Sequence, residues 1–330
     1  MLKKIAFPAS QLPLQCLYRN ENLLRQMAEN ADFCQIPEKV ERVYGPLVFP
    51  AAPPDRPYLT GCLVLSLDGR LGFENESSSR TLTSANKLDH SQGKTDLWLV
   101  NLVRTWADAV LLGTGTLKEE PEFTGHVYDP DLQAFREAHD SRFCRNPWNV
   151  IITRRPGELP WQHPVLSTPQ IPLLVVVPAS SRQELVDCPG GRFCYGVIDG
   201  ANPQETVGLA AMSAQMVNRQ LEKDPEGADP RHLVITLPDD HFPDFHTLLS
   251  LLRQLGVRQM AVESPHWIWQ LMAEKKLDEF FLTHTGVYAG GSVLPGTGHA
   301  FQPASAPQGQ LASLHMTPES VLFSRQVLVY

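Results

Sequence analysis

The chain has 330 residues, of which 42% are hydrophobic and 19% are charged, a composition typical of a globular protein with a substantial buried core. The formal net charge is −8 and no stripe is dense in lysine and arginine, which argues against nucleic acid as a partner. No run approaches the roughly 18 apolar residues of a membrane span, and the proline-broken start is a poor signal peptide. We therefore expect a cytoplasmic protein without a membrane partner.

The first 56 residues predict an extended arm rather than a domain. A short helix is expected from about residue 20 to residue 30, because Leu23, Leu24 and Met27 recur at helical spacing. The many prolines from Pro50 to Pro57 are typical of an extended segment that lies on another part of the protein.

Residues 57–330 predict one α/β domain in which short apolar runs alternate with helical patterns. We expect strands near 58–67, 108–112, 149–153, 172–177, 193–198, 232–237, 258–263, 279–285 and 320–329. We expect helices at about 84–106, 203–222, 244–255 and 265–275. Strand–helix–strand repetition favours a mostly parallel sheet, and the final run suggests a closing antiparallel edge. Two segments, near 125–147 and 199–231, are interpreted as insertions.

The cysteines and the known metal motifs give no sign of a metal. Six cysteines occur without CxxC pairs or regular spacing, which argues against both structural zinc and a disulfide scaffold. The zinc-deaminase pattern, the GxSxG elbow and HExxH are also missing from the sequence. We expect no metal.

Four short segments place polar residues just after predicted strands, where open α/β sheets hold ligands. Each also has a plainer interpretation. Asp68-Gly69 follows the first strand and is equally a common turn pair. Gly113-Thr114-Gly115-Thr116 allows a close approach of phosphate to the backbone, yet a tight glycine turn explains it as well. Thr153-Arg154-Arg155 could clamp a 2′-phosphate or simply be solvated. Ser264 and Pro265 suit a helix start, while Glu263 at the strand end could face a site.

The order of these segments resembles the reductase domain of riboflavin biosynthesis, the C-terminal half of a bifunctional deaminase–reductase. The resemblance covers about residues 56–330 and lacks the deaminase half. It rests on these segments: Arg56-Pro57-Tyr58, Ser66-Leu67-Asp68-Gly69-Arg70, Leu82-Thr83-Ser84, residues 107–116, residues 119–124, Val262-Glu263, Leu277-Asp278-Glu279 and Gly290-Gly291. It implies a three-layer fold like that of dihydrofolate reductase, with a mostly parallel central sheet and an antiparallel C-terminal edge.

The resemblance also implies an activity and a set of site residues. The activity is NADPH-dependent reduction of a small molecule, 5-amino-6-(5-phosphoribosylamino)uracil or its diamino analogue, to the ribitylamino product. Residues implied to bind the cofactor are Gly113, Gly115, Thr116, Thr153, Arg154 and Ser264. Asp68 and Glu263 are implied to act in the reaction, and residues implied to line the substrate site are Asp68, Thr83, Thr124 and His126.

The sequence departs from the family pattern at three places. Cys62 stands where many members have lysine, His126 stands where an arginine would grip the substrate phosphate, and Ser264-Pro265 replaces a Gly-Gly pair. Two alternatives therefore stay open: a nucleotide-binding or partner-binding protein without turnover, and a reductase of another small substrate. Dihydrofolate reductase proper is disfavoured by the SLDG and GTGT segments. We also expect a homodimer, from the resemblance and because an apolar final edge strand needs covering.

Overall fold

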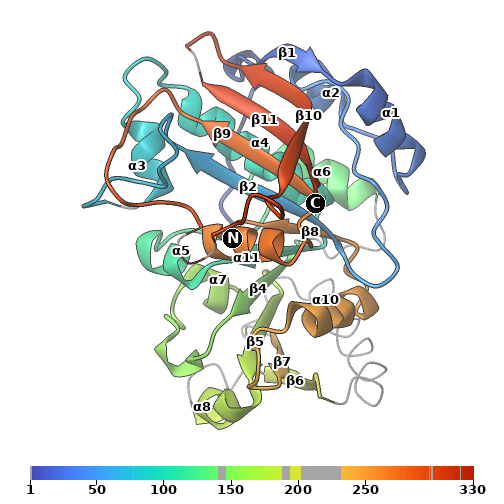
Figure 1. Cartoon of the computed structure of the whole chain (residues 1–330), viewed down its shortest axis with the longest axis vertical. Coiled ribbons are helices and arrows are strands. Elements are labelled where there is room, and N and C mark those ends of the chain that lie inside the picture. The colour runs from blue at the N-terminus through green and yellow to red at the C-terminus, as the bar shows by residue number, and fades with distance from the viewer. Residues whose placement is uncertain are drawn as a thin grey trace.

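A single sheet organises the residues that the computed structural model describes, which are 2–76, 78–139, 146–187, 194–201, 232–296, 298, 300–319 and 321–330. Across these residues the strand order is β1-β10-β11-β9-β2-β8-β3-β4-β5-β7-β6 (Figure 1). The strands are β1 (Gln15–Arg19), β2 (Tyr58–Leu65), β3 (Ala109–Leu112), β4 (Trp148–Ile152), β5 (Leu173–Pro178), β6 (Cys194–Asp199), β7 (His232–Leu237), β8 (Gln259–Val262), β9 (Glu279–His284), β10 (Gln308–Met316) and β11 (Leu322–Val329).

The helices connect most of these strands. They are α1 (Glu21–Glu29), α2 (Glu38–Val43), α3 (Ser79–Ser84), α4 (Gln92–Trp106), α5 (Thr114–Glu119), α6 (Pro130–His139), α7 (Pro164–Ser167), α8 (Arg182–Asp187), α10 (Phe245–Gln254) and α11 (Pro265–Ala273). The helix expected at 203–222, and most of the insertion expected at 199–231, lie outside the described residues. The insertion expected near 125–147 contains α6.

The strands from β9 to β6 in this order are all parallel, and β11, β10 and β1 continue the sheet as antiparallel strands. This confirms the fold class. One detail differs from the expectation: β11 is an interior strand, paired with β9 on one side and β10 on the other. We expected the apolar final strand to be an uncovered edge, which was one reason to expect a homodimer. That reason is wrong, because β10 and β1 continue the sheet beyond β11.

Side chains alternate between two hydrophobic cores, one on each face of the sheet. In β3, Val110 and Leu112 face a core that includes Trp98 and Leu102 of α4. Ala109 and Leu111 face the other core, which contains α10 and α11. Because both faces are covered, the central strands carry continuous apolar runs, and every residue of β5 is buried.

Local sequence signals set several helix ends. The Asp244 carboxylate accepts hydrogen bonds from the backbone N–H groups of His246 and Thr247 at the start of α10. Gly256, with φ of +98°, follows the end of that helix in the left-handed region. The helix expected at 84–106 begins only at Gln92, as α4, and the separate α3 ends at Ser84. Asn86 explains the late start, because its side-chain oxygen accepts from the N–H groups of Leu88 and Asp89 and forms a turn.

The N-terminal arm is built into the domain. The expected helix is confirmed as α1, capped by the Asn20 side chain, which accepts from the N–H of Leu23 at 3.1 Å. The sequence analysis missed α2 and β1, and β1 extends the sheet by pairing with β10. Phe7 and Leu12 are buried in the same core as α4, so the arm contributes to the folded unit.

Candidate active site

The site lies where parallel strands end and the chain turns into helices. A cavity of about 730 Å³, here called the larger cavity, lies beside the carboxyl ends of β2 and β8 and beside α3, α4 and α5. Five carboxylates line it: Asp96, Glu119, Glu120, Glu122 and Glu263. Its lining also includes the hydrophobic side chains of Leu63, Val64, Leu97, Val100 and Phe123.

A second cavity of about 360 Å³, here called the smaller cavity, lies beyond the end of β4. Its charged lining is mostly basic and comprises Lys118, Arg154, Arg155 and Glu158, and His266 also lines it. The two cavities share their boundary elements: in α5, Thr114 lines the smaller cavity while Gly115 and Thr116 line the larger one. At the start of α11, Pro265 lines the larger cavity and His266 lines the smaller one. A long ligand laid across these two helix starts would reach both cavities.

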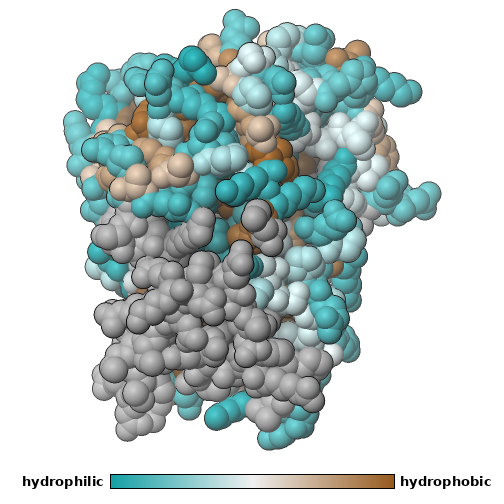
Figure 2. Space-filling view, turned by 180° about the vertical axis from the view of Figure 1, so that it is seen from behind, coloured by the Kyte–Doolittle hydropathy of each residue, from teal (hydrophilic) through white to brown (hydrophobic). Residues whose placement is uncertain are grey.

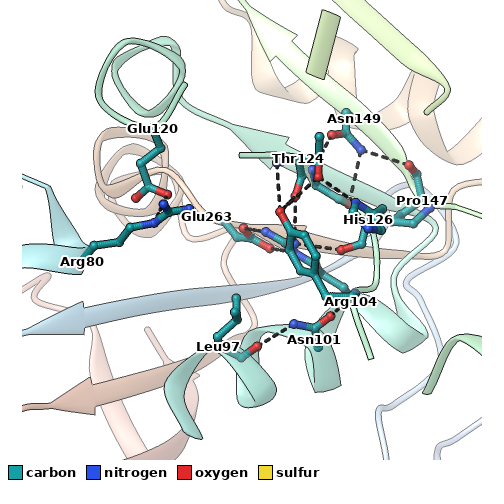
Figure 3. Close-up of polar contacts among 12 residues, drawn as sticks. Arg80, Leu97, Asn101, Arg104, Glu120, Thr124, His126, Pro147, Asn149 and Glu263 are labelled. Atoms are coloured by element: carbon teal, nitrogen blue, oxygen red, sulfur yellow. Dashed lines mark hydrogen bonds and ion pairs between the residues drawn. The ribbon is translucent and has the colours of Figure 1, made fainter. Parts of the chain in front are cut away.

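Arg104 and Glu263 form a two-point ion pair beside the larger cavity (Figure 3). The guanidinium Nε lies 2.7 Å from Oε1, and Nη2 lies 2.6 Å from Oε2. The remaining guanidinium nitrogen donates to the carbonyls of Thr124 and His126. Burial alone lowers the pKa of Arg104, but the charge and hydrogen bonds of Glu263 raise it above its usual value, so Arg104 stays charged. Glu263 thus faces the cavity, as expected, with both oxygens engaged.

Asp96 of α4 is a second carboxylate of this cavity. Burial raises the pKa of Asp96 to about 6; a hydrogen bond with Thr283 opposes the rise, and the charge of Glu263 adds to it. Near neutral pH a measurable fraction of this group therefore holds a proton. Cys62 lines the same cavity, and burial followed by the charges of Glu263 and Asp96 raises the pKa of its thiol. The thiol is therefore protonated and a poor nucleophile.

Thr124 and His126 are buried beside the larger cavity rather than among its lining residues. His126 Nε2 lies 2.8 Å from the carbonyl oxygen of Lys3, so this nitrogen carries the hydrogen and donates. Its Nδ1 then accepts from the Thr124 hydroxyl at 2.7 Å. Burial lowers the pKa of His126 to about 4, so the ring is neutral. In the structure His126 and Thr124 support the wall of the larger cavity, and their contact with a substrate stays a prediction.

Asp68 is also placed apart from the residues that line the two cavities. Its carboxylate accepts hydrogen bonds from Ser66 Oγ at 2.6 Å and from the backbone N–H groups of Ala289 at 3.0 Å and Gly290 at 2.8 Å. These bonds, that of Ser66 foremost, lower its pKa to about 2. Asp68 thereby holds the segment that contains Val293, which does line the larger cavity. Direct contact of Asp68 with a substrate stays a prediction.

The structure brings most of the expected cofactor residues to the boundary between the cavities. Gly115 and Thr116 line the larger cavity, and a Cβ added to Gly115 would meet no protein atom within 4 Å, so the backbone there is open to a ligand. Gly113 instead allows close packing, because a Cβ on it would lie 2.9 Å from Ser264 Oγ. Ser264 is buried against that glycine and makes no capping hydrogen bond through its side chain.

The remaining expected residues fall on both sides of that boundary. Thr153 and Arg154 line the smaller cavity, whereas Thr83 lines the larger one. The Arg154 guanidinium donates to the carbonyl oxygen of Phe242 and lies over its ring, with 5.0 Å between Cζ and the ring centroid. These two contacts orient a cation whose other N–H groups make no hydrogen bond to the described residues and can donate to an anion.

Sequence reasoning missed six polar residues of the larger cavity: Lys3, Arg80, His90, Asp96, Arg104 and Tyr128. Two of them left a signal, because Asp96 and Arg104 are charges on a helix whose neighbouring residues are largely apolar. Arg80 pairs with Glu120 at 3.0 Å, a tertiary contact that no local pattern indicates (Figure 3). Lys3 belongs to the arm, which carries no motif.

The described part of the chain contains neither a candidate metal-binding group nor a helix that could span a membrane. No group of three or more His, Cys, Asp or Glu side chains there could hold a metal ion. No helix among those residues is both long and apolar enough to cross a membrane. On the face opposite to that of Figure 1, hydrophilic and hydrophobic residues are intermixed over the described surface (Figure 2).

These features define an α/β protein with two adjoining cavities at the carboxyl edge of a largely parallel sheet, the edge at which open α/β sheets hold ligands. The chain belongs to the RibD C-terminal domain family, whose sequence profile matches residues 57–323. This membership supports an oxidoreductase of the riboflavin-biosynthesis reductase type. No curated protein matches the chain.

Solved structures agree with the family in fold. A pyrimidine reductase-like protein from Corynebacterium diphtheriae aligns with a TM-score of 0.52 and 15% identity, over 88% of this chain and 98% of that one. RibD from Acinetobacter baumannii aligns with a TM-score of 0.52 and 18% identity, over 84% of this chain. The match spans 59% of that RibD chain.

Proposed function

We propose that this chain is an NADPH-dependent reductase that converts a ribosylaminopyrimidinone 5′-phosphate to its ribitylamino product. The substrate would be 5-amino-6-(5-phosphoribosylamino)uracil or its diamino analogue. The observation that carries the proposal is the pair of adjoining cavities, one acidic and one basic, at the carboxyl edge of the sheet. Family membership and the fold support the same reaction class.

The residues present fit a phosphorylated dinucleotide. Gly115 leaves open space at the boundary between the cavities, where a pyrophosphate can approach the backbone. Thr153, Arg154 and Lys118 of the smaller cavity supply a hydroxyl and cations suited to the 2′-phosphate that distinguishes NADPH from NADH. The larger cavity would then take the nicotinamide and the substrate together.

When bound, NADPH supplies a hydride, and the chain provides the surroundings in which the reduction completes. A ribosylamine in its ring-opened form contains a C=N bond. As carbon gains the hydride, the nitrogen needs a proton. Asp96 is suited to deliver it, because it lines the larger cavity and stays partly protonated near neutral pH. Leu97, Val100 and Phe123 give the larger cavity an apolar part of its lining, which would lower the polarity around the reacting groups.

The proposal is tested in two steps with the purified full chain. NADPH and NADH are first titrated by fluorescence, and the ribosylaminopyrimidine phosphates are then screened for loss of NADPH absorbance. We expect micromolar or tighter binding of NADPH and oxidation only with a ribosylaminopyrimidine. Tight NADPH binding without oxidation by any pyrimidine would favour a non-catalytic nucleotide-binding protein instead.

Gly115 provides a matched pair of variants for the binding step. Gly115→Asp places a negative charge in the open space beside the expected pyrophosphate, so it should weaken NADPH binding strongly. Gly115→Ala adds a methyl group in the same space and should weaken it less. Since neither side chain meets protein atoms at its Cβ, both variants should fold. Equal NADPH affinity in the two variants and the wild type would show that the cofactor does not bind at the boundary beside Gly115.

A further inference from the structure

The N-terminal segment of the arm forms part of the wall of the larger cavity. Lys3 and Ile5 line the cavity beside Tyr128, although this segment precedes the residues matched by the family. Two backbone contacts fix it there: the N–H of Ile5 donates to the carbonyl of Tyr128 at 3.0 Å, and His126 Nε2 donates to the carbonyl of Lys3 at 2.8 Å. This chain thus adds its own wall to the family domain.

The segment is held firmly enough to position a side chain. Phe7 is only 1% exposed and belongs to the core that contains α4. Lys94 of α4 contacts the same segment, with its ammonium 6.0 Å from the Phe7 ring centroid and bonded to Gln11 Oε1. Because the Lys3 carbonyl and the residues that follow it are bonded to the domain, the position of the Lys3 backbone is defined.

Lys3 differs in its ion-pair partners from the two arginines that line the larger cavity. Both guanidinium groups that line the cavity are paired with carboxylates, Arg104 with Glu263 and Arg80 with Glu120. Among the described residues, the Lys3 ammonium has no ion pair within 4.0 Å, and its side chain is exposed. An exposed cation that forms no ion pair among the described residues, at the wall of a cavity, is suited to a ligand that brings its own negative charge.

We propose that Lys3 binds the phosphate of a sugar-phosphate substrate and so makes the larger cavity selective for phosphorylated over unphosphorylated ligands. This inference rests on the proposed function for the identity of the substrate. The proposal assigns the phosphate contact to Lys3 of the arm. His126 stands where the family pattern has an arginine, but its ring is buried and neutral. Instead of contacting a phosphate, the His126 ring donates to the Lys3 carbonyl and anchors the segment. His126 is thus a positioning residue for the segment.

The test compares Lys3→Gln with Lys4→Gln, since Lys4 is a neighbouring exposed lysine that does not line the cavity. Point variants are preferred to deletion because Phe7 is part of the core. We expect Lys3→Gln to raise KM for the phosphorylated pyrimidine about tenfold, the effect of one charge-assisted contact, with little change in kcat. KM for the dephosphorylated pyrimidine and the Kd for NADPH should stay at the wild-type values, as should every constant of Lys4→Gln.

A binding measurement separates this proposal from the proposed function. Ribose 5-phosphate and ribose are titrated calorimetrically against the wild type and both variants, with no reaction required. Binding of ribose 5-phosphate that is lost in Lys3→Gln and kept in Lys4→Gln supports the phosphate contact even if no pyrimidine is reduced. A wild-type enzyme that reduces the pyrimidine phosphate, with identical KM in Lys3→Gln, would overturn the Lys3 assignment and leave the reductase standing. Equal affinity of Lys3→Gln and wild type for ribose 5-phosphate would overturn it as well.

Discussion

Arg104 and Glu263, 159 positions apart in sequence, are joined by two hydrogen bonds that tie α4 to the turn after β8. The Arg104 side chain is fully buried and that of Glu263 is only 10% exposed, so neither charge has water to replace its partner. The pair therefore shapes the wall of the larger cavity and also contributes to the stability of the fold.

Removing one member of this pair should destabilise the protein. Glu263→Ala leaves a buried, unpaired guanidinium, so we expect the free energy of unfolding to fall by about 3–5 kcal/mol. The double variant Arg104→Met, Glu263→Leu should recover much of that loss, because no unpaired charge remains. Urea unfolding of the single and double variants measures the coupling. Strictly additive losses would show that the pair is not an energetic unit.

This dual role bears on how activity data for Glu263 are interpreted. Loss of turnover in Glu263→Ala alone would not identify a catalytic group, since unfolding produces the same result. Glu263→Gln keeps the shape and part of the hydrogen bonding, so its activity is informative only beside its measured stability.

Buried strands and their spacing made the fold predictable from sequence, whereas contacts between distant segments made the site only partly predictable. An apolar run such as 172–177 predicts a strand that is covered on both faces, and in the structure this run forms β5. By contrast, β10 carries polar residues along much of its length and was missed. Lys3 reaches the cavity through hydrogen bonds to residues more than 120 positions away, which no local pattern encodes.

The smaller cavity leads to a prediction about cofactor choice. Arg154→Ala should weaken NADPH binding about tenfold or more and leave NADH nearly unchanged, because a charge-assisted hydrogen bond to the 2′-phosphate contributes roughly 1.5–3 kcal/mol. Arg182→Ala, which removes an exposed arginine that does not line the cavity, controls for net charge. Dissociation constants from fluorescence titration decide the matter, and equal weakening of both cofactors would contradict the assignment.

Asp96 leads to a prediction about pH. If its protonated form supplies the proton, kcat should fall as pH rises through about 6, since the protonated fraction declines there. Asp96→Asn should lower kcat and abolish that part of the pH profile, while the Kd for NADPH stays the same. A wild-type profile that is retained in Asp96→Asn would exclude Asp96 as the proton donor.

The same substitution should have an opposite effect on stability. The pKa of Asp96 is raised in the folded protein, so its contribution to stability is complete below its unfolded pKa and is lost as pH rises through about 6. At pH 7.5 the folded protein therefore carries the cost of a partly buried carboxylate, which asparagine avoids. We expect Asp96→Asn to be more stable than wild type at pH 7.5, by on the order of 2 kcal/mol, and to lose this advantage near pH 4. Thermal or urea unfolding at the two pH values provides the comparison.

The last prediction concerns Asp68, whose carboxylate holds the backbone of Ala289 and Gly290. Asparagine offers one acceptor oxygen where aspartate offers two, so Asp68→Asn must weaken at least one of these contacts. Because Val293 of the same segment lines the larger cavity, we expect KM for the pyrimidine to rise while NADPH binding survives. Hydrogen exchange at the Ala289 and Gly290 amides should accelerate in parallel, which a direct substrate contact alone would not cause.

Two outcomes of that experiment differ in kind. Faster exchange together with a raised KM supports Asp68 as the residue that positions the 287–293 segment. Unchanged exchange with a large loss of turnover would mean that Asp68 contacts the substrate itself, as the family resemblance implies. Ser66→Ala removes the third hydrogen bond to Asp68 without touching the Ala289 and Gly290 contacts, so it is the matched control. In that variant the two amides should exchange more slowly than in Asp68→Asn, because the aspartate still accepts from both.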